Sequence, residues 1–373
     1  MLSSLKRLLQ IAEKVIDKKS SLPILKEICF ENGAARVTDL ETTVVMPVPD
    51  NRSYTLPVNL LSKVLKARPH ELEIALDEGS VEVLYDGQTL TYKSKDVSDF
   101  PGVPKGKFKA VGSWHRDVLQ ALSAQAASCS MDALKPALCG VHTTIKDSLL
   151  TIAATDGHLL RIQNGLDVSK SKPLTGILPT GPLALLTLLA RGHTKVGQSD
   201  THLSFALPGD VTLYLRLINE AYPDVASVVP AEFAGEVVFN RDMLLDLVKS
   251  ARLFADRSTC LSIWQVSPHI DNLLVENLEE TITWSGLLPI SSKNGESIRI
   301  GFDLRLMERA LKAQQSPMVR WQYSTPDRAT VIKEEGEDWE SGAVTVVMPV
   351  RLKEEEESHD QKRDNRSATT AGG

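Results

Sequence analysis

One pattern recurs three times along this chain of 373 residues, at intervals of about 120 residues. A repeat of that length can bury a core of its own, so it indicates three domains rather than a solenoid of short repeats. Each copy reads helix, strands, helix, strands, which predicts an α+β unit with two helices packed on antiparallel sheet. The first helix of each copy is predicted over residues 5–16, 114–127 and 243–251, with Ser113 and Asn240 as caps of the later two, and the second begins near Leu56, Leu178 and Gly301.

The copies also agree in their short motifs. Thr38-Asp39 and Thr155-Asp156 fall in register, whereas the third copy keeps only the strand pattern of Leu261 to Val266 at this place. Turn-forming motifs close the copies at Asp99-Phe100-Pro101, Tyr222-Pro223-Asp224 and Val347-Met348-Pro349. The predicted domains are therefore residues 1–106, 107–230 and 231–352, followed by a polar, acidic segment, 353–373, which is predicted to be disordered.

Composition favours a soluble protein with several cores. Hydrophobic residues make up 42% of the chain and charged residues 24%, and no apolar run approaches the roughly 20 residues of a membrane span. No leader precedes Leu2, so we expect the cytoplasm. The four cysteines are Cys29, Cys129, Cys139 and Cys260, and none of them stands in Cys-x-x-Cys spacing. We therefore expect buried free thiols, and we expect neither a bound metal nor a cofactor.

Charge is distributed unevenly. The chain has a net charge of −6, yet most of the predicted helices carry a cationic face opposite an apolar one. A solvated face explains any single helix, but the recurrence in an acidic chain favours a shared surface that meets phosphate. Helix-face reasoning selects Lys6, Arg7, Lys14, Lys63, Lys66, Arg305, Arg309 and Lys312 for this surface.

Five motifs in order give the chain a family resemblance. They are Leu22-Pro23-Ile24-Leu25, Thr38-Asp39-Leu40-Glu41, Ala154-Thr155-Asp156-Gly157-His158, Tyr222-Pro223-Asp224 with Val229-Pro230, and the run from Val346 to Leu352. Together they resemble the β subunit of bacterial DNA polymerase III, the sliding clamp. The resemblance implies a DNA clamp fold and a ring of two head-to-tail copies, with helices lining the hole. It also implies a processivity factor whose partners are duplex DNA, the replicative polymerase, the clamp loader and repair polymerases.

Several sites follow from the resemblance alone. It adds Lys19 to the DNA contacts and places Leu90, Tyr92, Leu253 and Phe254 at the dimer interface, although Leu253 and Phe254 could simply be core. It also implies a pocket between the second and third domains for short partner peptides. Leu159 and Ser227 stand where the family commonly has Arg, so this pocket is expected to be more apolar and less cationic. Its wall would comprise Leu138, Thr155, Gly157, His158, Leu159, Leu160, Pro223, Ser227, Val228, Val346, Val347, Met348, Pro349, Val350, Arg351 and Leu352.

Other interpretations stay open. Thr155 to His158 could be no more than a strand-ending turn with a capping Asp and a Gly at positive φ. A hydrolase could use Asp156 and His158 with Cys129 or Cys139, but no nucleophile elbow, phosphate loop or metal-spaced cluster accompanies them, so no enzyme is expected. A diverged clamp-like protein could bind partners without encircling DNA. Family members usually begin with a strand, and this chain starts almost inside its first helix, so either the first domain lacks that strand or the start of the chain is misassigned.

Overall fold

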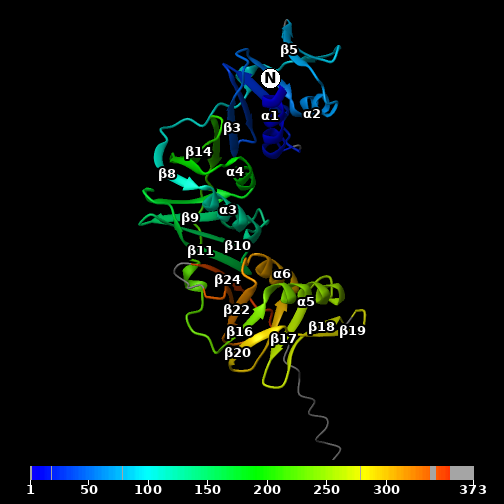
Figure 1. Cartoon of the computed structure of the whole chain (residues 1–373), viewed down its shortest axis with the longest axis vertical. Helices are drawn as coiled ribbons and strands as arrows, with labels where there is room; N and C mark the ends of the chain where they lie inside the picture. The colour runs from blue at the N-terminus through cyan, green and yellow to red at the C-terminus, as the bar shows by residue number, and fades with distance from the viewer. Residues whose placement is uncertain (1, 18, 78, 278, 337–341, 353–373) are drawn as a thin grey trace, which may run out of the picture. The chain divides into compact units, whose positions relative to one another are not determined.

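The computed structural model describes residues 2–17, 19–77, 79–277, 279–336 and 342–352. The predicted acidic segment 353–373 lies outside the described residues. The fold is α+β, as predicted, with six α-helices and antiparallel strands in the described chain (Figure 1). The chain divides into two compact units, the first formed by residues 1–229, 313–316 and 331–347, and the second by 230–312, 317–330 and 348 onward. The three-domain boundaries stay a prediction.

The element order repeats three times. The first repeat contains α1 (Leu2–Val15), β1 (Glu27–Glu31), β2 (Ala34–Thr38), β3 (Thr42–Pro47), β4 (Tyr54–Pro57), α2 (Val58–Lys66), β5 (Leu72–Asp77), β6 (Ser80–Tyr85) and β7 (Gln88–Lys93). The second contains β8 (Lys109–His115), α3 (Arg116–Gln125), β9 (Gly140–Lys146), β10 (Leu149–Thr155), β11 (Leu159–Asp167), β12 (Leu174–Pro179), α4 (Leu183–Leu189), β13 (His193–Gln198), β14 (His202–Leu207) and β15 (Val211–Arg216).

The third repeat has the same order with one additional strand. It contains β16 (Gly235–Asn240), α5 (Arg241–Phe254), β17 (Leu261–Val266), β18 (Asp271–Asn277), β19 (Ile282–Leu287), β20 (Ile290–Gly295), β21 (Ile298–Asp303), α6 (Leu304–Lys312), β22 (Met318–Tyr323), β23 (Thr330–Glu334) and β24 (Ala343–Val347). The second and third repeats begin with a strand, whereas no strand precedes α1 within the described residues.

The helices form because apolar residues recur every three or four positions. In α1 the buried residues are Leu5, Leu8, Ile11, Ala12 and Val15, which face one side, as predicted. The two helices of each repeat pack on each other, α1 on α2, α3 on α4 and α5 on α6 (Figure 1). Each pair therefore hides its apolar stripes against the other helix and the neighbouring sheet.

Four predicted helix starts fall too early, because Leu56, Trp114, Leu178 and Gly301 still belong to the strands β4, β8, β12 and β21. Ser113 and Trp114 belong to strand β8, where the Trp114 side chain is fully buried, and the His115 ring accepts the N–H of Asp117 at 3.4 Å as the actual cap of α3. Strand β8, with its alternating side chains, extends to His115, two residues beyond the helix cap predicted at Ser113. The helix expected near Leu178 begins at Leu183, because Leu178 and the following proline still belong to β12.

The other predicted cap is confirmed. The Asn240 side chain accepts the N–H of Met243 at 3.1 Å at the start of α5. It thereby satisfies one of the first backbone donors of that helix, which otherwise have no partner within the helix. Helix α5 begins directly after strand β16, so the cap also marks where the chain changes from strand to helix.

Antiparallel pairing joins consecutive repeats inside the first unit. One sheet has the order β4-β1-β2-β3-β15-β14-β13-β8, in which β3 of the first repeat pairs with β15 of the second. A second run has the order β12-β9-β10-β11-β24, with β24 supplied by the third repeat. Strands β5-β6-β7 form a separate sheet. In the second unit, β22-β16-β20 and β19-β18-β17-β21 are neighbours in these orders.

Each unit has its own aromatic packing. In the first unit Trp114 meets Phe205 edge to face, with ring centroids 6.0 Å apart. In the second, Trp264 contacts Phe302 and Trp321 at 5.5 and 5.8 Å. All four thiols are free, and Cys139 is half-buried whereas the other three are buried, so the prediction is correct for those three. None of the described helices combines the length and apolar character needed to cross a membrane.

Candidate functional site

The Thr-Asp-Gly-His motif forms a tight turn between β10 and β11. The Thr155 hydroxyl donates to the Leu159 carbonyl at 2.8 Å and accepts the N–H of Gly157 at 3.0 Å. Asp156 Oδ1 accepts the N–H groups of His158 and Leu159 at 2.9 and 2.8 Å. Gly157 has φ of 96°, a conformation that glycine adopts without strain. The motif is therefore a capped turn, as one interpretation of the sequence expected.

The same turn occurs in the other two repeats. Asp39 Oδ1 accepts the N–H groups of Glu41 and Thr42 at 3.0 and 2.6 Å. In the third repeat a serine replaces the aspartate, and Ser267 Oγ accepts the N–H of Ile270 at 3.0 Å. The sequence comparison missed this third turn because it relied on the Thr-Asp pair, whereas a hydroxyl oxygen can cap the same backbone groups.

The structure brings part of the predicted peptide pocket together in the first unit. Strands β11 and β24 pair so that Leu159 lies opposite Val347 and Leu160 opposite Val346. Leu159 is only 1% exposed, so its side chain belongs to the core of this unit. The predicted wall residues of this unit that are exposed are Gly157, His158, Pro223, Ser227 and Val228.

Tyr222 links the segment that contains Pro223 to strands β9 and β10. Its ring stacks on His142 with centroids 4.7 Å apart, and its hydroxyl donates to the Ala153 carbonyl at 3.4 Å. Burial raises the pKa of Tyr222 and lowers that of His142, so both rings are uncharged at neutral pH. Leu138 is half-buried in the same unit.

The last part of the predicted pocket wall lies in the second unit. Met348, Pro349, Val350, Arg351 and Leu352 follow β24, and the N–H of Val350 donates to the Gly301 carbonyl at 2.8 Å. A Cβ on Gly301 would lie 2.5 Å from the Val350 carbonyl oxygen, so only glycine lets the C-terminal segment cross β21 at this distance.

The cationic residues of the first unit are mostly open to solvent. Lys6 and Lys14 of α1, Lys63 and Lys66 of α2, and Lys19 are all exposed. Arg7 differs, because its guanidinium donates to the Pro208 carbonyl at 2.6 Å and thus ties α1 to the β14–β15 turn.

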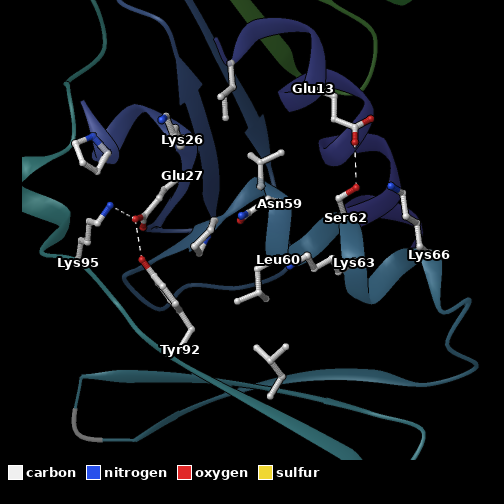
Figure 2. A pocket seen from close by; sticks show the side chains of 15 residues that line it. Glu13, Lys26, Glu27, Asn59, Leu60, Ser62, Lys63, Lys66, Tyr92 and Lys95 are labelled. Carbon is white, nitrogen blue, oxygen red and sulfur yellow. Dashed lines mark hydrogen bonds and ion pairs between the residues drawn. The ribbon is translucent and has the colours of Figure 1, made fainter. Parts of the chain in front are cut away.

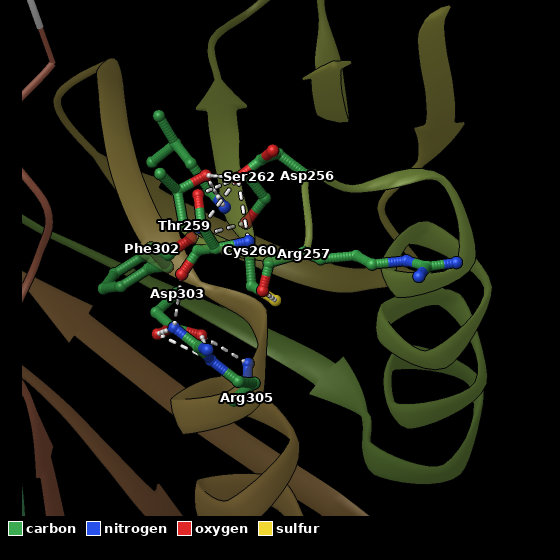
Figure 3. Close-up of polar contacts among 10 residues, drawn as sticks. Asp256, Arg257, Thr259, Cys260, Ser262, Phe302, Asp303 and Arg305 are labelled. Carbon is green, nitrogen blue, oxygen red and sulfur yellow. Dashed lines mark hydrogen bonds and ion pairs between the residues drawn. The ribbon is translucent and has the colours of Figure 1, made fainter. Parts of the chain in front are cut away.

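Two predicted cationic residues of the second unit, Arg305 and Lys312, are engaged by acidic side chains. Arg305 forms an ion pair with Asp303 at 2.7 Å and also donates to the Ser258 carbonyl (Figure 3). Lys312 and Arg252 both contact Glu308 at 2.6 Å. The hydrogen bond from Lys312 holds the pKa of Glu308 below its ordinary value. The predicted cationic face of α6, which also includes the half-buried Arg309, is therefore largely neutralised.

A groove of about 890 Å³ opens in the first repeat (Figure 2). Leu60 of α2 and Leu90 and Tyr92 of β7 supply its apolar surface. Its floor holds Glu27, which is 1% exposed, accepts the Tyr92 hydroxyl at 2.8 Å and forms an ion pair with Lys95. Burial, followed by this hydrogen bond, raises the pKa of Tyr92. The sequence predicted Leu90 and Tyr92 as interface residues but gave no signal for Leu60 or Glu27.

An exposed apolar patch lies at the end of α5 in the second unit. Leu253 is 81% exposed, so it is not core, and Leu287 is 82% exposed on the edge strand β19. Phe254 is 38% exposed and stacks on Trp284 of β19, with centroids 6.3 Å apart. Solvent-exposed apolar groups that gather in this way mark a contact surface. Sequence reasoning found Leu253 and Phe254 but missed Trp284, because β19 is far from them in the chain.

The groups proposed for hydrolysis have structural contacts of their own. Asp156 Oδ1 is used by two backbone N–H groups of its turn. The Cys139 thiol donates to the Asp132 carbonyl at 3.2 Å, and the Cys129 thiol to the Gln125 carbonyl at 4.0 Å. Among the described residues, no group of three or more His, Cys, Asp and Glu side chains could hold a metal ion.

Comparison with known proteins agrees with the motifs. No protein-family model matches the chain. The β sliding clamp of Synechococcus elongatus is 22% identical over 366 residues, covering 92% of this chain and 96% of that protein. The β sliding clamp of Pseudomonas putida is 24% identical over 370 residues, with the same coverage. The resemblance inferred from the motifs is thus confirmed over most of the chain.

Solved structures give the same answer for the fold. The β subunit from DNA polymerase of Streptococcus pyogenes superimposes with a TM-score of 0.86 at 20% identity, covering 94% of this chain and 98% of that one. A sliding clamp from Pseudomonas aeruginosa bound to griselimycin gives 0.85 at 22% identity, with the same coverage. The chain therefore has the fold of these proteins.

Proposed function

We propose that this chain is a sliding clamp, which closes as a head-to-tail ring of two copies around duplex DNA and tethers the replicative polymerase and other partners. The likeness to β sliding clamps over nine-tenths of the chain supports the function. We assign the protein no catalytic role, because Asp156, Cys129 and Cys139 serve the turn and the carbonyls described above.

The observation that carries the ring is the pattern of strand edges. Strand β3 of the first repeat pairs with β15, the last strand of the second repeat, and β11 of the second repeat pairs with β24, the last strand of the third. In both cases the pairing strand is the third of the strands that follow the first helix of its repeat. By the same order, β19 is the third such strand and β7 is the last strand of the first repeat. Both lie at sheet edges in the described chain. A second copy can therefore continue the pattern by pairing its β7 with β19.

The side chains of the two edges suit this pairing. Strand β7 turns Leu90 and Tyr92 inward and exposes Thr89 and Thr91. Strand β19 likewise alternates, with Trp284 partly buried between exposed neighbours. Cross-strand pairs of aromatic and aliphatic residues stabilise a ladder, and rows of hydroxyl groups avoid repulsion between the two copies. We call the proposed interface between two copies, which includes the β7–β19 pairing and the side chains beside it, the seam.

DNA contact is proposed for the exposed lysines of the first unit. Lys6, Lys14, Lys19, Lys63 and Lys66 offer diffuse positive charge without groups arranged to read base edges. Such contacts bind any sequence and allow sliding. The ion pairs of Arg305 and Lys312 reduce what α6 can contribute, so we assign α6 a smaller share.

Partner binding is proposed beside the Thr155–His158 turn. Gly157 and His158 of the turn are exposed, as are Pro223, Ser227 and Val228, and Tyr222 ties the latter segment to β10 through the Ala153 carbonyl. A short peptide with two or three apolar anchors suits such a surface. The residues Met348 to Leu352 stay a prediction for the same function.

A second candidate keeps the partner surface without the ring. It is a clamp-like protein that does not encircle DNA, and the neutralised cations of α6 favour it. Light scattering across a dilution series distinguishes the two: the clamp requires about twice the 40.9 kDa chain mass, and a monomer at every concentration refutes the ring. Retention on nicked circular DNA that is lost on linearisation further identifies encirclement, whereas a dimer that is not retained supports the second candidate.

A further inference from the structure

The carboxylate at the floor of the groove has one oxygen without a partner. Glu27 Oε1 receives the Tyr92 hydroxyl and Lys95, as Figure 2 shows, but Oε2 has no hydrogen bond to any described residue. The side chain is 1% exposed, so water does not surround this oxygen freely. A buried charged oxygen without a donor is costly, which indicates that a donor reaches it in the assembled protein.

The groove restricts what that donor can be. Its lining holds four lysines, Lys26, Lys63, Lys66 and Lys95, against two carboxylates, Glu13 and Glu27, so electrostatic attraction alone would not draw in a free cation. If the donor belongs to a larger apolar surface, that surface can pack on Leu60 and Leu90 and bring the donor to Glu27. Arginine fits this role because its guanidinium is planar, weakly hydrated and suited to buried carboxylate pairs.

The second unit presents such an arginine beside its apolar patch. Arg257 follows Phe254 by three residues, is exposed, and forms no ion pair with any described residue. Figure 3 shows its side chain extending away from the neighbouring polar cluster. In that cluster Asp256 Oδ1 accepts the N–H groups of Ser258 and Thr259 at 3.0 and 2.8 Å, so the loop that carries Arg257 is fixed. Arg252, the other nearby arginine, is bound to Glu308.

We propose that Arg257 of one copy donates to Glu27 Oε2 of the other when the apolar end of α5 enters the groove. This contact rests on the proposed ring, and it would make the seam specific for a second copy of this chain. Leu253 and Phe254 supply apolar burial that many surfaces could match, whereas Glu27 Oε2 needs a donor at one position. A partner without that donor leaves Oε2 unsatisfied, although Oε1 keeps Tyr92 and Lys95, so the contact favours pairing of this chain with itself.

Matched substitutions test the contact in the full-length chain. Glu27→Gln keeps an acceptor for Tyr92 but removes the charge, and Arg257→Gln removes the donor from an exposed position. A ring of two copies contains two seams, so each substitution acts twice. We expect about a tenfold loss per seam, and thus about a hundredfold higher dissociation constant for the dimer. Arg328→Gln, at another exposed arginine of the second unit, is the control and should leave the constant unchanged.

The double variant gives the decisive comparison. If the two groups contact each other, Glu27→Gln with Arg257→Gln weakens the dimer little more than either change alone. Additive losses, or a wild-type dimer that Arg257→Gln leaves unchanged, would overturn the contact and leave the ring intact. A wild-type chain that is monomeric at every concentration would overturn both. Urea unfolding of each variant shows whether Glu27→Gln also destabilises the fold, and the Arg257→Gln result stands independently of it.

Discussion

Truncating Leu253 should open the proposed ring while leaving the fold of each chain unchanged. Leu253→Ala removes three carbon groups, each contributing about 0.8 kcal/mol when fully buried. The side chain is 81% exposed in the single chain, so nearly all of that surface is available to the seam. The loss is then about 2 kcal/mol per seam and about 4 kcal/mol for two seams, which raises the dissociation constant of the dimer about a thousandfold.

The assay is sedimentation equilibrium or light scattering over a dilution series. Met243→Ala is the matched control, because Met243 is 61% exposed on the first turn of the same helix. Both substitutions should leave the free energy of unfolding of the monomer within about 0.5 kcal/mol of wild type, since neither side chain is in the core. An unchanged dissociation constant for Leu253→Ala, or equal weakening by Met243→Ala, would refute the assignment of this patch to the seam.

Two further predictions concern charge. Replacing Lys6 and Lys14 with Glu should weaken DNA retention and reduce the salt dependence of binding by about two phosphate contacts. Arg305→Ala should reduce the salt dependence by less than one contact, because Asp303 already pairs with that guanidinium. Equal effects of the two changes would contradict the proposed division between the units. The depressed pKa of Glu308 contributes stability that is complete above its ordinary value of 4.5 and is lost as the pH falls through the lower value of the folded state. Urea midpoints measured from pH 6 downward should fall less steeply in Glu308→Gln than in wild type, and parallel curves would show that the carboxylate does not contribute.

Local patterns were enough for most of the fold. The apolar spacing of α1 and the cap at Asn240 depend on residues within one or two helical turns, so the sequence displays them directly. The helix expected from Trp114 is present as α3 but begins at Arg116, because strand alternation and helical spacing look alike over a few residues and burial of Trp114 keeps it in β8.

The sites depended more on contacts between distant segments. Two ion pairs of α6 could have been predicted from spacing: Asp303 with Arg305, and Glu308 with Lys312 at i and i+4. They would have indicated that the cationic face of α6 is a weaker candidate for DNA contact. Trp284, by contrast, meets the end of α5 only through the folded sheet. Glu27 likewise gains its significance from burial beside β7, which no spacing in the sequence reveals.

The uncharged edges of the seam separate two responses to ionic strength. Strand β7 carries one charge, Lys93, and β19 carries none. Added salt screens the exposed lysines from phosphate, but it has little to screen along the hydroxyl rows and apolar side chains of the seam, and it screens the proposed Arg257–Glu27 contact only weakly because Glu27 is buried. In concentrated salt the proposed ring would therefore stay closed around a circular duplex that it no longer attracts. Its hold would be purely mechanical, and its friction along the helix would be at its lowest.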